Sequence, residues 1–468
     1  MRDEIGADAW ARLGRAREQA RVLLAGRAVW HVNSTAQGGG VAEMLRTLLP
    51  YWRGDGIDAR WLVVTAPNGY FRLTKRLHNM LHGAPQRALG LADEELFELT
   101  ARRLASAAVR AVEPGDVVIL HDPQTAGFVK RLKRVGAVVI WRCHVGSDRP
   151  SASSEAAWAF LLPHVRGADR LVFTRRAYVP AAFDPNQVRL LTPGIDPCSP
   201  KNQPLPPAAA RAILARTGIG HPPRPGSGPV RVPLAENGTA EVRRASHVLR
   251  TGPPVHLDSE RLVVALARWD RLKDPVGLMS AFVSHVSTPG AHLIVAGPDV
   301  SAVADDPEGA EVLAEVSAAW SRLDEEARRR VDIAALPMDD LAENALIVNA
   351  LQRQAAVVVK KSIQEGFGLG VTEAMWKSKP VVASGVGGHR DQIDSGRTGL
   401  LVDDPAAFAS FGSAIERTLD DAALSLSMGL AAHDRVRRQY LADRHFASWV
   451  EILNEVLCEH PGRGRSGG

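Results

Sequence analysis

Residues 360–376 constrain the fold of this chain more than any other stretch. They read KKSIQEGFGLGVTEAMW and follow the apolar run Ala355–Val359, which is typical of a buried parallel strand. The glycine-rich segment Gly366–Gly370 comes next, and Val371–Lys377 then predicts a helix. The order of strand, glycine-rich turn and helix directs a helix N-terminus and backbone N–H groups at one place, where an anion such as phosphate is favoured.

Two carboxylates bracket this turn, Glu365 before it and Glu373 just after it. A carboxylate is unsuited to bind phosphate, but it accepts hydrogen bonds from sugar hydroxyls. One hypothesis is therefore a nucleotide-sugar site, with Glu365 on the sugar and Glu373 on the ribose. The alternative is a plain strand–turn–helix in which one glutamate stabilises the helix dipole and the other is exposed. The spacing alone leaves both open.

The string EGFGLGVTEAM resembles the E-x7-E signature of retaining glycosyltransferases with the GT-B fold, an α/β architecture of two Rossmann-like domains facing each other across a cleft. The longer string KSIQEGFGLGVTEAMWKSKPVVASGVGG is similar to the trehalose synthases that transfer glucose from a nucleotide-glucose to free glucose. The chain departs from the pattern of this family at four places: Ala-Leu-Ala at 265–267, Lys360 where Gln is common, Gly370 where Thr is common, and His389 after the Gly387-Gly388 turn. The resemblance implies donor-binding roles for residues of the loop itself: Lys361, Gly366, Phe367, Gly368 and Leu369.

A second glycine-rich loop lies near the start of the chain. The predicted strand Ala28–Asn33 leads into a loop that contains Gly38, Gly39 and Gly40, and a predicted helix follows. No G-x-G-x-x-G spacing is present, so a dinucleotide site is not indicated. Three glycines suit close approach to a phosphate or sugar, and a tight turn is the alternative. The resemblance implies that Asn33 and this loop bind the donor.

Polar residues follow two further predicted strands. Asp116–Leu120 ends in His121-Asp122-Pro123-Gln124, and Ala137–Arg142 ends in Cys143-His144. The carboxyl ends of strands are where open α/β sheets bind ligands, although such residues also serve as helix caps. The strings HDPQ and WRCH match the trehalose-synthase pattern. That resemblance implies that Asp122, Gln124 and Arg142 bind substrate and that His144 orients the donor sugar and assists electrostatically.

The second half opens with the predicted strand Arg261–Ala267, followed by RWDRLKDP. Asp274 is placed to cap a helix that begins at Pro275. Arg268 and Lys273 would hold a diphosphate and stabilise it as a leaving group. The alternative is a solvated charge cluster in which aspartates pair with both cations. The string R-W-D-x-x-K-D is similar to the diphosphate-binding motif of the resembled family.

These signals predict the following organisation. An N-terminal Rossmann-like acceptor domain spans 1–195, and a C-terminal Rossmann-like donor domain spans 258–440. Between them, 196–257 is expected to be a linker with an insertion at about 222–257, because Asn237-Gly238 between two strand-like runs indicates a hairpin. A helix at 441–459 is expected to cross back to the first domain, and 460–468 to be a disordered tail.

The composition of the chain limits the classes of partner and cofactor that we expect it to bind. A net charge of +5 without a continuous basic face argues against nucleic acid, and three scattered cysteines indicate neither disulfides nor a metal site. The sequence shows no secretory signal and no membrane-length apolar run, which predicts a cytoplasmic protein. Because no Asp-x-Asp follows a strand, we expect no obligatory metal or other cofactor, with Mg²⁺ at most stimulatory. The expected partners are a nucleotide-sugar and a small sugar, and we allow for a homodimer.

The expected function is that of a retaining glycosyltransferase that makes α,α-trehalose from nucleotide-diphosphate glucose and glucose. Three alternatives stay open. The same donor chemistry could act on another small acceptor, such as a sugar or an aminocyclitol. A trehalose phosphorylase would use inorganic phosphate in place of the nucleotide. A non-catalytic sensor would bind the sugar nucleotide without turning it over.

Overall fold

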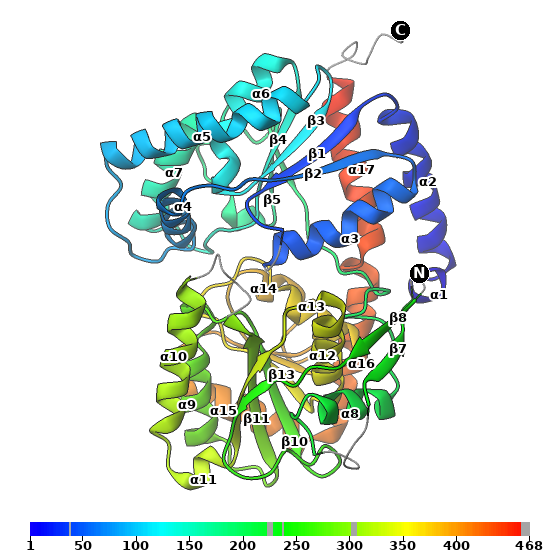
Figure 1. Ribbon diagram of the computed structural model, residues 1–468, viewed down its shortest axis with the longest axis vertical. Helices are drawn as coiled ribbons and strands as arrows, with labels where there is room; N and C mark the ends of the chain where they lie inside the picture. Colours follow the sequence, from blue (N-terminus) through cyan, green and yellow to red (C-terminus); the bar gives the residue numbers. More distant parts are fainter. Residues whose placement is uncertain (37–38, 222–227, 236–237, 301–306, 460–468) are drawn as a thin grey trace. The chain divides into compact units, whose positions relative to one another are not determined.

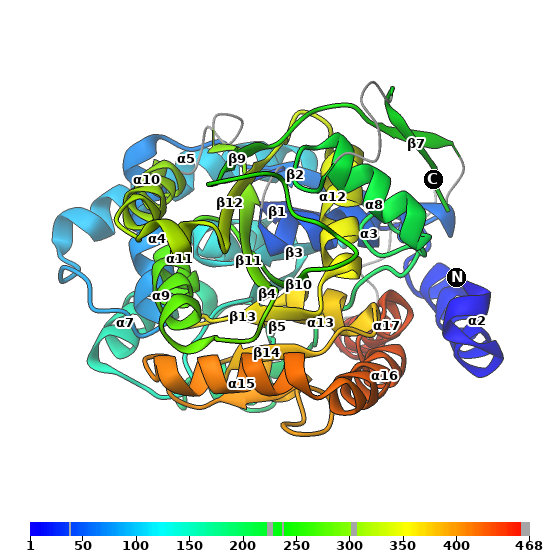
Figure 2. The same cartoon turned by 90° about the horizontal axis from the view of Figure 1, so that it is seen from below.

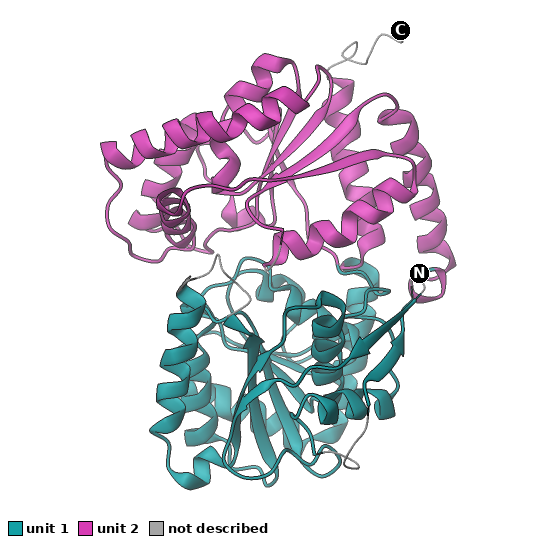
Figure 3. Cartoon of the chain, in the orientation of Figure 1, with its two compact units in different colours: residues 1, 195–439 teal, residues 2–194, 440–468 magenta. Residues whose placement is uncertain are grey.

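A computed structural model describes residues 1–36, 39–221, 228–235, 238–300 and 307–459 (Figure 1). The chain forms two compact units (Figure 3). Unit 2 consists of Arg2–Gly194 and Tyr440–Gly468, and unit 1 consists of Met1 and Ile195–Gln439. Unit 2 is therefore built from two separate segments of chain. The expected tail at 460–468 and the expected glycine ligand Gly38 lie outside the described residues.

Unit 2 is built on a six-stranded parallel sheet in the order β2-β1-β3-β4-β5-β6. Its strands are β1 (Ala28–Asn33), β2 (Asp58–Val63), β3 (Val117–His121), β4 (Val138–Cys143), β5 (Arg170–Phe173) and β6 (Val188–Leu190). Every residue of β1, β3 and β4 is buried, as expected for parallel strands covered on both faces.

Helices cover both faces of this sheet (Figure 1). One layer contains α2 (Ala7–Leu23), α3 (Gly40–Gly54) and α17 (Ala442–Cys458), and the other contains α4 (Asn68–Leu81), α5 (Leu91–Ala111), α6 (Val129–Val135) and α7 (Ala152–Val165). The short elements are α1 (Arg2–Ile5), η1 (Pro123–Phe128) and η2 (Arg176–Tyr178). Helix α17 packs on α2 and α3, so the last described helix completes the core of unit 2.

Unit 1 contains a seven-stranded sheet in the order β15-β14-β13-β10-β11-β12-β9. Its strands are β9 (His247–Leu249), β10 (Arg261–Leu266), β11 (Ala291–Pro298), β12 (Val331–Leu336), β13 (Val357–Lys360), β14 (Val381–Ser384) and β15 (Leu400–Val402). All neighbouring pairs are parallel except β12 and β9, which are antiparallel.

The helices of unit 1 lie on both sides of its sheet (Figure 2). One side carries α9 (Pro275–His285), α10 (Pro307–Ser321) and α11 (Glu325–Arg328), and the other carries α8 (Pro207–Arg216), α12 (Leu341–Gln354) and α13 (Leu369–Trp376). The remaining elements are η3 (Arg271–Lys273), α14 (Gly388–Gln392), α15 (Phe408–Asp420) and α16 (Ala422–Gln439). Asp274 caps α9 as predicted, since its carboxylate accepts the Gly277 N–H at 3.0 Å.

The interval 196–257 lies in the same compact unit as 258–439, whereas the sequence predicted a linker between two domains. The hairpin is present as β7 (Val230–Pro233) and β8 (Thr239–Val242), but it packs on α8 and α12 with Val232 and Val242 buried. Residues 247–249 form β9 instead of extending the hairpin. The interval is part of unit 1 because the hairpin buries Val232 and Val242 and because β9 pairs with β12.

None of the helices in the described parts of the chain combines the length and the apolar character that a membrane span requires.

Candidate active site

The loop between β13 and α13 is held in place by the turn after β14. Gly368 caps α13 with φ +86°, a backbone conformation that favours glycine. The N–H of Gly388 donates to the carbonyl of Gly366 at 3.1 Å. A Cβ on Gly388 would collide with the backbone of Phe367. The two glycine-rich turns therefore depend on each other for their positions.

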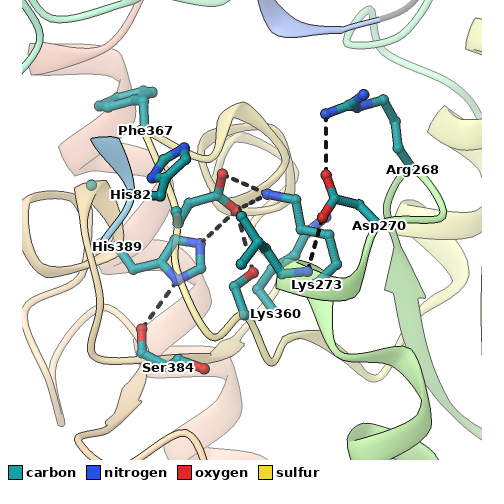
Figure 4. A network of polar contacts seen from close by, with 12 residues as sticks. His82, Arg268, Asp270, Lys273, Lys360, Phe367, Ser384 and His389 are labelled. Carbon is teal, nitrogen blue, oxygen red and sulfur yellow. Dashed lines mark hydrogen bonds and ion pairs between the residues drawn. The ribbon is translucent and has the colours of Figure 1, made fainter. Parts of the chain in front are cut away.

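Glu365 lies at the start of this loop and is bound on several sides. Its two carboxylate oxygens accept hydrogen bonds from Lys273 Nζ at 2.7 and 2.6 Å. His389 Nε2 lies 3.6 Å from the same carboxylate, while His389 Nδ1 contacts the carbonyl of Ser384 at 3.0 Å. Lys273 and His389 thus approach one carboxylate from η3 and α14 (Figure 4). Burial would raise the pKa of Glu365, but the charge of Lys273 and the hydrogen bond from His389 hold it well below its usual range.

The two predicted diphosphate ligands, Arg268 and Lys273, follow β10. Arg268 Nη2 lies 3.5 Å from a carboxylate oxygen of Asp270, and its side chain is 41% exposed (Figure 4). Asp270 is buried and also caps η3 through the N–H of Leu272 at 2.8 Å. The predicted charge cluster therefore exists, but Asp274 does not take part in it, since its ion-pair partner is Lys361.

Lys361 is not placed to meet a ligand. Its ammonium is buried beside the rings of Phe408 and Phe411, where it pairs with Asp274. Successive residues of an extended segment point to opposite faces, and the neighbouring Lys360 points the other way, toward the loop. Lys360 Nζ donates to the carbonyl of Leu266, and burial lowers its pKa to about 8.

Two of the departures from the resembled pattern, Lys360 and Gly370, lie against each other. A Cβ on Gly370 would lie 2.6 Å from Lys360 Nζ, so the lysine occupies the space that a side chain at position 370 would need. A side chain at position 370 would therefore require the end of the Lys360 side chain to move.

Glu373 lies inside the first turns of α13 and is almost fully buried. Lys201 Nζ lies 2.9 Å from one carboxylate oxygen, and Gln352 Nε2 lies 3.5 Å from the other. Burial acts to raise the pKa of Glu373, but the charges of Lys201 and Lys377 outweigh it and lower the pKa below its ordinary value. The carboxylate is therefore ionised and fixed in one orientation.

In unit 2, the loop after β1 is held by Asn33. The side-chain oxygen of Asn33 accepts from Trp61 Nε1 at 2.8 Å, and its amide nitrogen donates to the carbonyl of Thr35 at 2.7 Å. Gly39 has φ +78° and caps α3, whose first residue is Gly40. Asn33 therefore positions the backbone of the loop through both ends of its amide.

Asp122 follows β3 with φ +60°, an uncommon value for a residue other than glycine. Its carboxylate accepts the N–H of His144 at 2.8 Å, and its carbonyl accepts from Trp141 Nε1 at 3.1 Å. Burial raises the pKa of Asp122 to about 7. The carbonyl of Gln124 accepts from Tyr70 Oη at 2.9 Å. These bonds bring the ends of β3 and β4 together as the strand-end rule predicts.

His121 links two other histidines. Its Nε2 lies 3.1 Å from His31 Nδ1, and its Nδ1 lies 2.9 Å from His144 Nε2. Arg142 is fully buried beside this group, with its guanidinium 5.3 Å from the ring centre of Trp449. Burial lowers the pKa of Arg142 to about 9.

Sequence reasoning missed four residues that contact the predicted ones: His31, Lys201, Lys360 and His389. Two of them carried a signal as departures from the resembled pattern: Lys360, and His389 after the Gly387-Gly388 turn. Lys201 and His31 make contacts that join distant parts of the chain, which no local pattern reveals. Among the described residues, no group of three or more histidine, cysteine, aspartate or glutamate side chains is arranged to hold a metal ion.

Known proteins resemble both halves of the chain. Residues 31–180 match the family described as trehalose synthase, N-terminal domain, and residues 260–421 match the family described as glycosyl transferases group 1. A crystal structure of an α,α-trehalose-phosphate synthase (UDP-forming) from Burkholderia vietnamiensis has a TM-score of 0.65 at 14% identity, covering 93% of this chain and 98% of that one. Anabaena HepE in complex with UDP-glucose has a TM-score of 0.61 at 14% identity, covering 92% and 99%.

The two sheets and these likenesses define a glycosyltransferase with the GT-B fold, built from two Rossmann-like units. Closer relatives narrow the class. The trehalose synthase of Pyrococcus horikoshii is 32% identical over 441 residues, which cover 92% of this chain and 91% of the relative. That of Rubrobacter xylanophilus is 33% identical over 440 residues, covering 93% and 92%. This chain belongs to the trehalose synthase family.

A more distant relative is the trehalose phosphorylase of Pleurotus pulmonarius, which is 24% identical over 428 residues. The chain spans about half of that relative, since the match covers 86% of this chain and 53% of the phosphorylase.

Proposed function

We propose that this protein is a retaining glycosyltransferase that moves glucose from a nucleotide-diphosphate glucose to glucose and forms α,α-trehalose. The observation that carries the proposal is the bond of Lys273 to both oxygens of Glu365, beside the glycine-rich start of α13. An ammonium has three N–H donors, so Lys273 can contact Glu365 and a phosphate oxygen together. The pair therefore suits a ligand that carries a sugar on a diphosphate.

In this proposal the cations stabilise the leaving group. The bond from the anomeric carbon to the diphosphate breaks, and negative charge grows on the departing oxygen. Lys273 and Arg268 provide positive charge for that oxygen. The acceptor hydroxyl forms the new bond on the same face of the sugar, and its proton passes to the departing diphosphate. The configuration at the anomeric carbon is thereby retained.

Glu365 is proposed to orient a hydroxyl of the transferred sugar. Its low pKa and its two bonds to Lys273 make it a weak base and a hindered nucleophile, but they leave it a good hydrogen-bond acceptor. Glu373 is proposed to accept hydrogen bonds from the ribose. The backbone of Gly366, Phe367, Gly368 and Leu369 would contact the phosphates at the start of α13.

Residues of unit 2 are proposed to act on the sugars. His144 would orient the donor sugar, while Asp122, Gln124, Arg142, Asn33 and the loop at Gly39 and Gly40 would shape the surroundings of substrate. Arg142 is fully buried, so its contribution is to the charge at the strand ends rather than a direct contact. We propose that no metal is obligatory, because the phosphate charge is assigned to Arg268 and Lys273.

The test is an incubation of purified protein with a panel of nucleotide-diphosphate glucose donors, with and without glucose. We expect nucleoside diphosphate and a non-reducing disaccharide to appear together only when glucose is present, and NMR should show the α,α linkage. Parallel arms contain EDTA, other sugars or an aminocyclitol. Nucleotide release at one rate with and without every acceptor would overturn the transferase proposal, and binding without turnover would indicate a sensor.

A second candidate is trehalose phosphorolysis, which the match to the Pleurotus phosphorylase favours. In that reaction inorganic phosphate takes the place of the nucleotide and glucose 1-phosphate is released. Incubation with trehalose and phosphate separates the two proposals. A phosphorylase forms glucose 1-phosphate without any nucleotide, whereas the proposed transferase does not.

A further inference from the structure

Three histidines form a hydrogen-bonded row through unit 2. His31 comes from β1, His121 ends β3, and His144 follows β4. The N–N distances are 3.1 Å between His31 and His121 and 2.9 Å between His121 and His144. His31 and His121 expose no more than 1% of their surface to solvent, and His144 is half-buried. The row therefore runs from the interior to the one member that is proposed to meet substrate.

All three imidazoles are neutral near pH 7. Burial, with the charge of Arg142, lowers the pKa of His31 to about 3. Burial and the neighbouring histidines and Arg142 hold the pKa of His121 well below its ordinary value, and burial with Arg142 and His445 does the same for His144. A neutral imidazole has one N–H and one lone pair, so each bond in the row has a donor end and an acceptor end.

The N–H donors of the row can all point inward, toward His31, or all point outward, toward His144. The surroundings of His31 Nε2, at the inner end, distinguish the two arrangements. His31 Nε2 is buried and has no hydrogen-bond partner in the described part of the chain. If the protons pointed inward, this atom would be an N–H donor without an acceptor. If they point outward, it is only an unused lone pair. Buried N–H groups without partners are rarer than under-used acceptors, which favours the outward direction.

The surroundings of His31 Nε2 support that choice. The rings of Trp52 and Trp449 lie 6.0 and 6.2 Å from the His31 ring, and their indole N–H groups also lack partners among the described residues. Arg142 adds guanidinium N–H groups that lack partners as well. An indole or a guanidinium can only donate. None of these neighbouring N–H groups can accept an inward-pointing proton from His31 Nε2.

We infer that His31 and His121 are positioning residues that hold His144 as the neutral Nδ1–H tautomer, so that His144 presents a hydrogen-bond donor to an oxygen of the substrate sugar. His31 Nδ1–H donates to His121 Nε2, and His121 Nδ1–H donates to His144 Nε2. With Nε2 occupied and Nδ1 protonated, His144 has no lone pair available to act as a base. The inference rests on the proposed function only in giving His144 a sugar as its ligand.

The tautomer can be read directly by two-dimensional NMR of ¹⁵N-histidine-labelled protein at pH 7, with His144→Gln assigning the signals. We expect the pattern of Nδ1–H with unprotonated Nε2 for His144. A protonated Nε2 in the wild-type protein would overturn the inference. This measurement is made on the wild-type protein and needs no turnover, so it stands even if no glycosyl transfer is found.

Variants at position 121 test the positioning role. His121→Leu removes the donor to His144, and the His144 pattern should then shift toward Nε2–H. His121→Asn places an amide N–H near the former Nδ1 and should preserve the wild-type pattern. The kcat of His121→Leu should fall about 10- to 100-fold, the usual range for residues that orient a functional side chain, with Asn restoring part of it.

His164→Leu is the matched control, because it removes a mostly buried imidazole of the same unit outside the row. It should change neither the His144 pattern nor kcat. An unchanged His144 tautomer in His121→Leu would show that the row does not set it, and equal losses of kcat in the Leu and Asn variants would overturn the positioning role.

Discussion

Lys273 and Glu365 are 92 residues apart in sequence, yet one ammonium bonds to both oxygens of one carboxylate at 2.7 and 2.6 Å. The two residues come from η3 after β10 and from the loop after β13, and β10 and β13 are neighbours in the sheet. Adjacent parallel strands thus deliver a cation and an anion to the same edge. This pairing makes the chemistry of each residue depend on the other.

Replacing Lys273 with alanine should slow the chemical step. Charge on the departing diphosphate grows as the glycosidic bond breaks, so kcat should fall by about 10²–10³ while donor binding changes less. Arg268→Ala should act in the same way, and the double variant should lose less than the product of the two single losses. Steady-state kinetics and donor titration measure both quantities.

Arg271→Ala is the control for that series, because Arg271 pairs with Glu315 on the surface. It should retain normal turnover, and thermal unfolding should be recorded for every variant. Folded Lys273→Ala with near-normal kcat would mean that the diphosphate is held elsewhere.

The pH dependence of stability should reveal the low pKa of Glu365. A carboxylate whose pKa is lowered on folding stabilises the protein above its ordinary pKa of 4.5, and the contribution is lost as pH falls through the folded value. The difference in Tm between wild type and Glu365→Gln should therefore be largest near neutral pH and shrink below 4.5. Glu315→Gln, on the surface, should show almost no difference. A gap for Glu365→Gln that stays constant down to pH 3 would contradict the shift.

Substitution of Glu373 should affect donor binding more than turnover. Glu373→Gln keeps the shape of the side chain but weakens its acceptance of hydrogen bonds from ribose, and the donor KM should rise about tenfold with little change in kcat. Glu343→Gln is a matched control, since Glu343 is a buried glutamate of α12 that accepts the N–H groups of Arg243 and Arg244. It should lower Tm and leave KM unchanged. A lowered kcat with an unchanged donor KM in Glu373→Gln would show that Glu373 does not bind the donor.

Gly388→Ala should disturb the loop between β13 and α13, although residue 388 itself is not proposed to contact the donor. The added methyl group would collide with the backbone of Phe367. Overpacking of this kind typically lowers the free energy of unfolding by about 1–3 kcal/mol. We expect a lower Tm together with a raised donor KM. Gly14→Ala is the comparison, because Gly14 lies inside α2 and a Cβ there meets nothing within 4 Å. It should leave the donor KM unchanged and raise Tm slightly, since alanine favours a helix more than glycine does. Unchanged KM in a destabilised Gly388→Ala would show that the two turns are not coupled.

Two replacements separate the hairpin from the rest of its interval. A short Gly/Ser linker in place of 230–242 should leave unit 1 folded, with a lower Tm from the loss of buried Val232 and Val242. The same linker in place of 222–257 also removes β9 and uncovers the edge of β12, so that protein should fail to fold or aggregate. Circular dichroism and size-exclusion chromatography distinguish the outcomes. Equal stability of the two proteins would support the prediction that 222–257 is an insertion that the fold does not need.

The order of strands and helices could be predicted because it is local. Apolar runs such as Ala355–Val359, the Asp274-Pro275 cap and the glycine-rich turns are signals that neighbouring residues carry together. Strand β9 could not be predicted, since three residues acquire their identity by pairing with β12, some 80 positions later in the chain. From local sequence, the strand-like run after Asn237-Gly238 predicts only the second strand of the hairpin.

The site was predictable to the extent that strand ends converge. That rule grouped Asp122 with His144, which do form a hydrogen bond, and the resemblance named Lys273 and Glu365, which form an ion pair. It could not decide which of Lys360 and Lys361 points toward the loop, because a change of one position along an extended segment reverses the face. Nor could it find Lys201 beside Glu373, since that contact depends on how the 196–206 segment packs on α13.

The helix α17 has a consequence for how the protein is made. Trp449 and Phe446 of α17 are fully buried in the core of unit 2, against His31 and Trp52. During translation the first 194 residues leave the ribosome well before α17, and domains generally fold as they emerge. Unit 1 can fold while unit 2 still lacks α17, one of the helices on one face of its sheet. A message cut short near codon 440 would therefore yield a folded unit 1 and an incomplete unit 2 that exposes apolar surface to proteases.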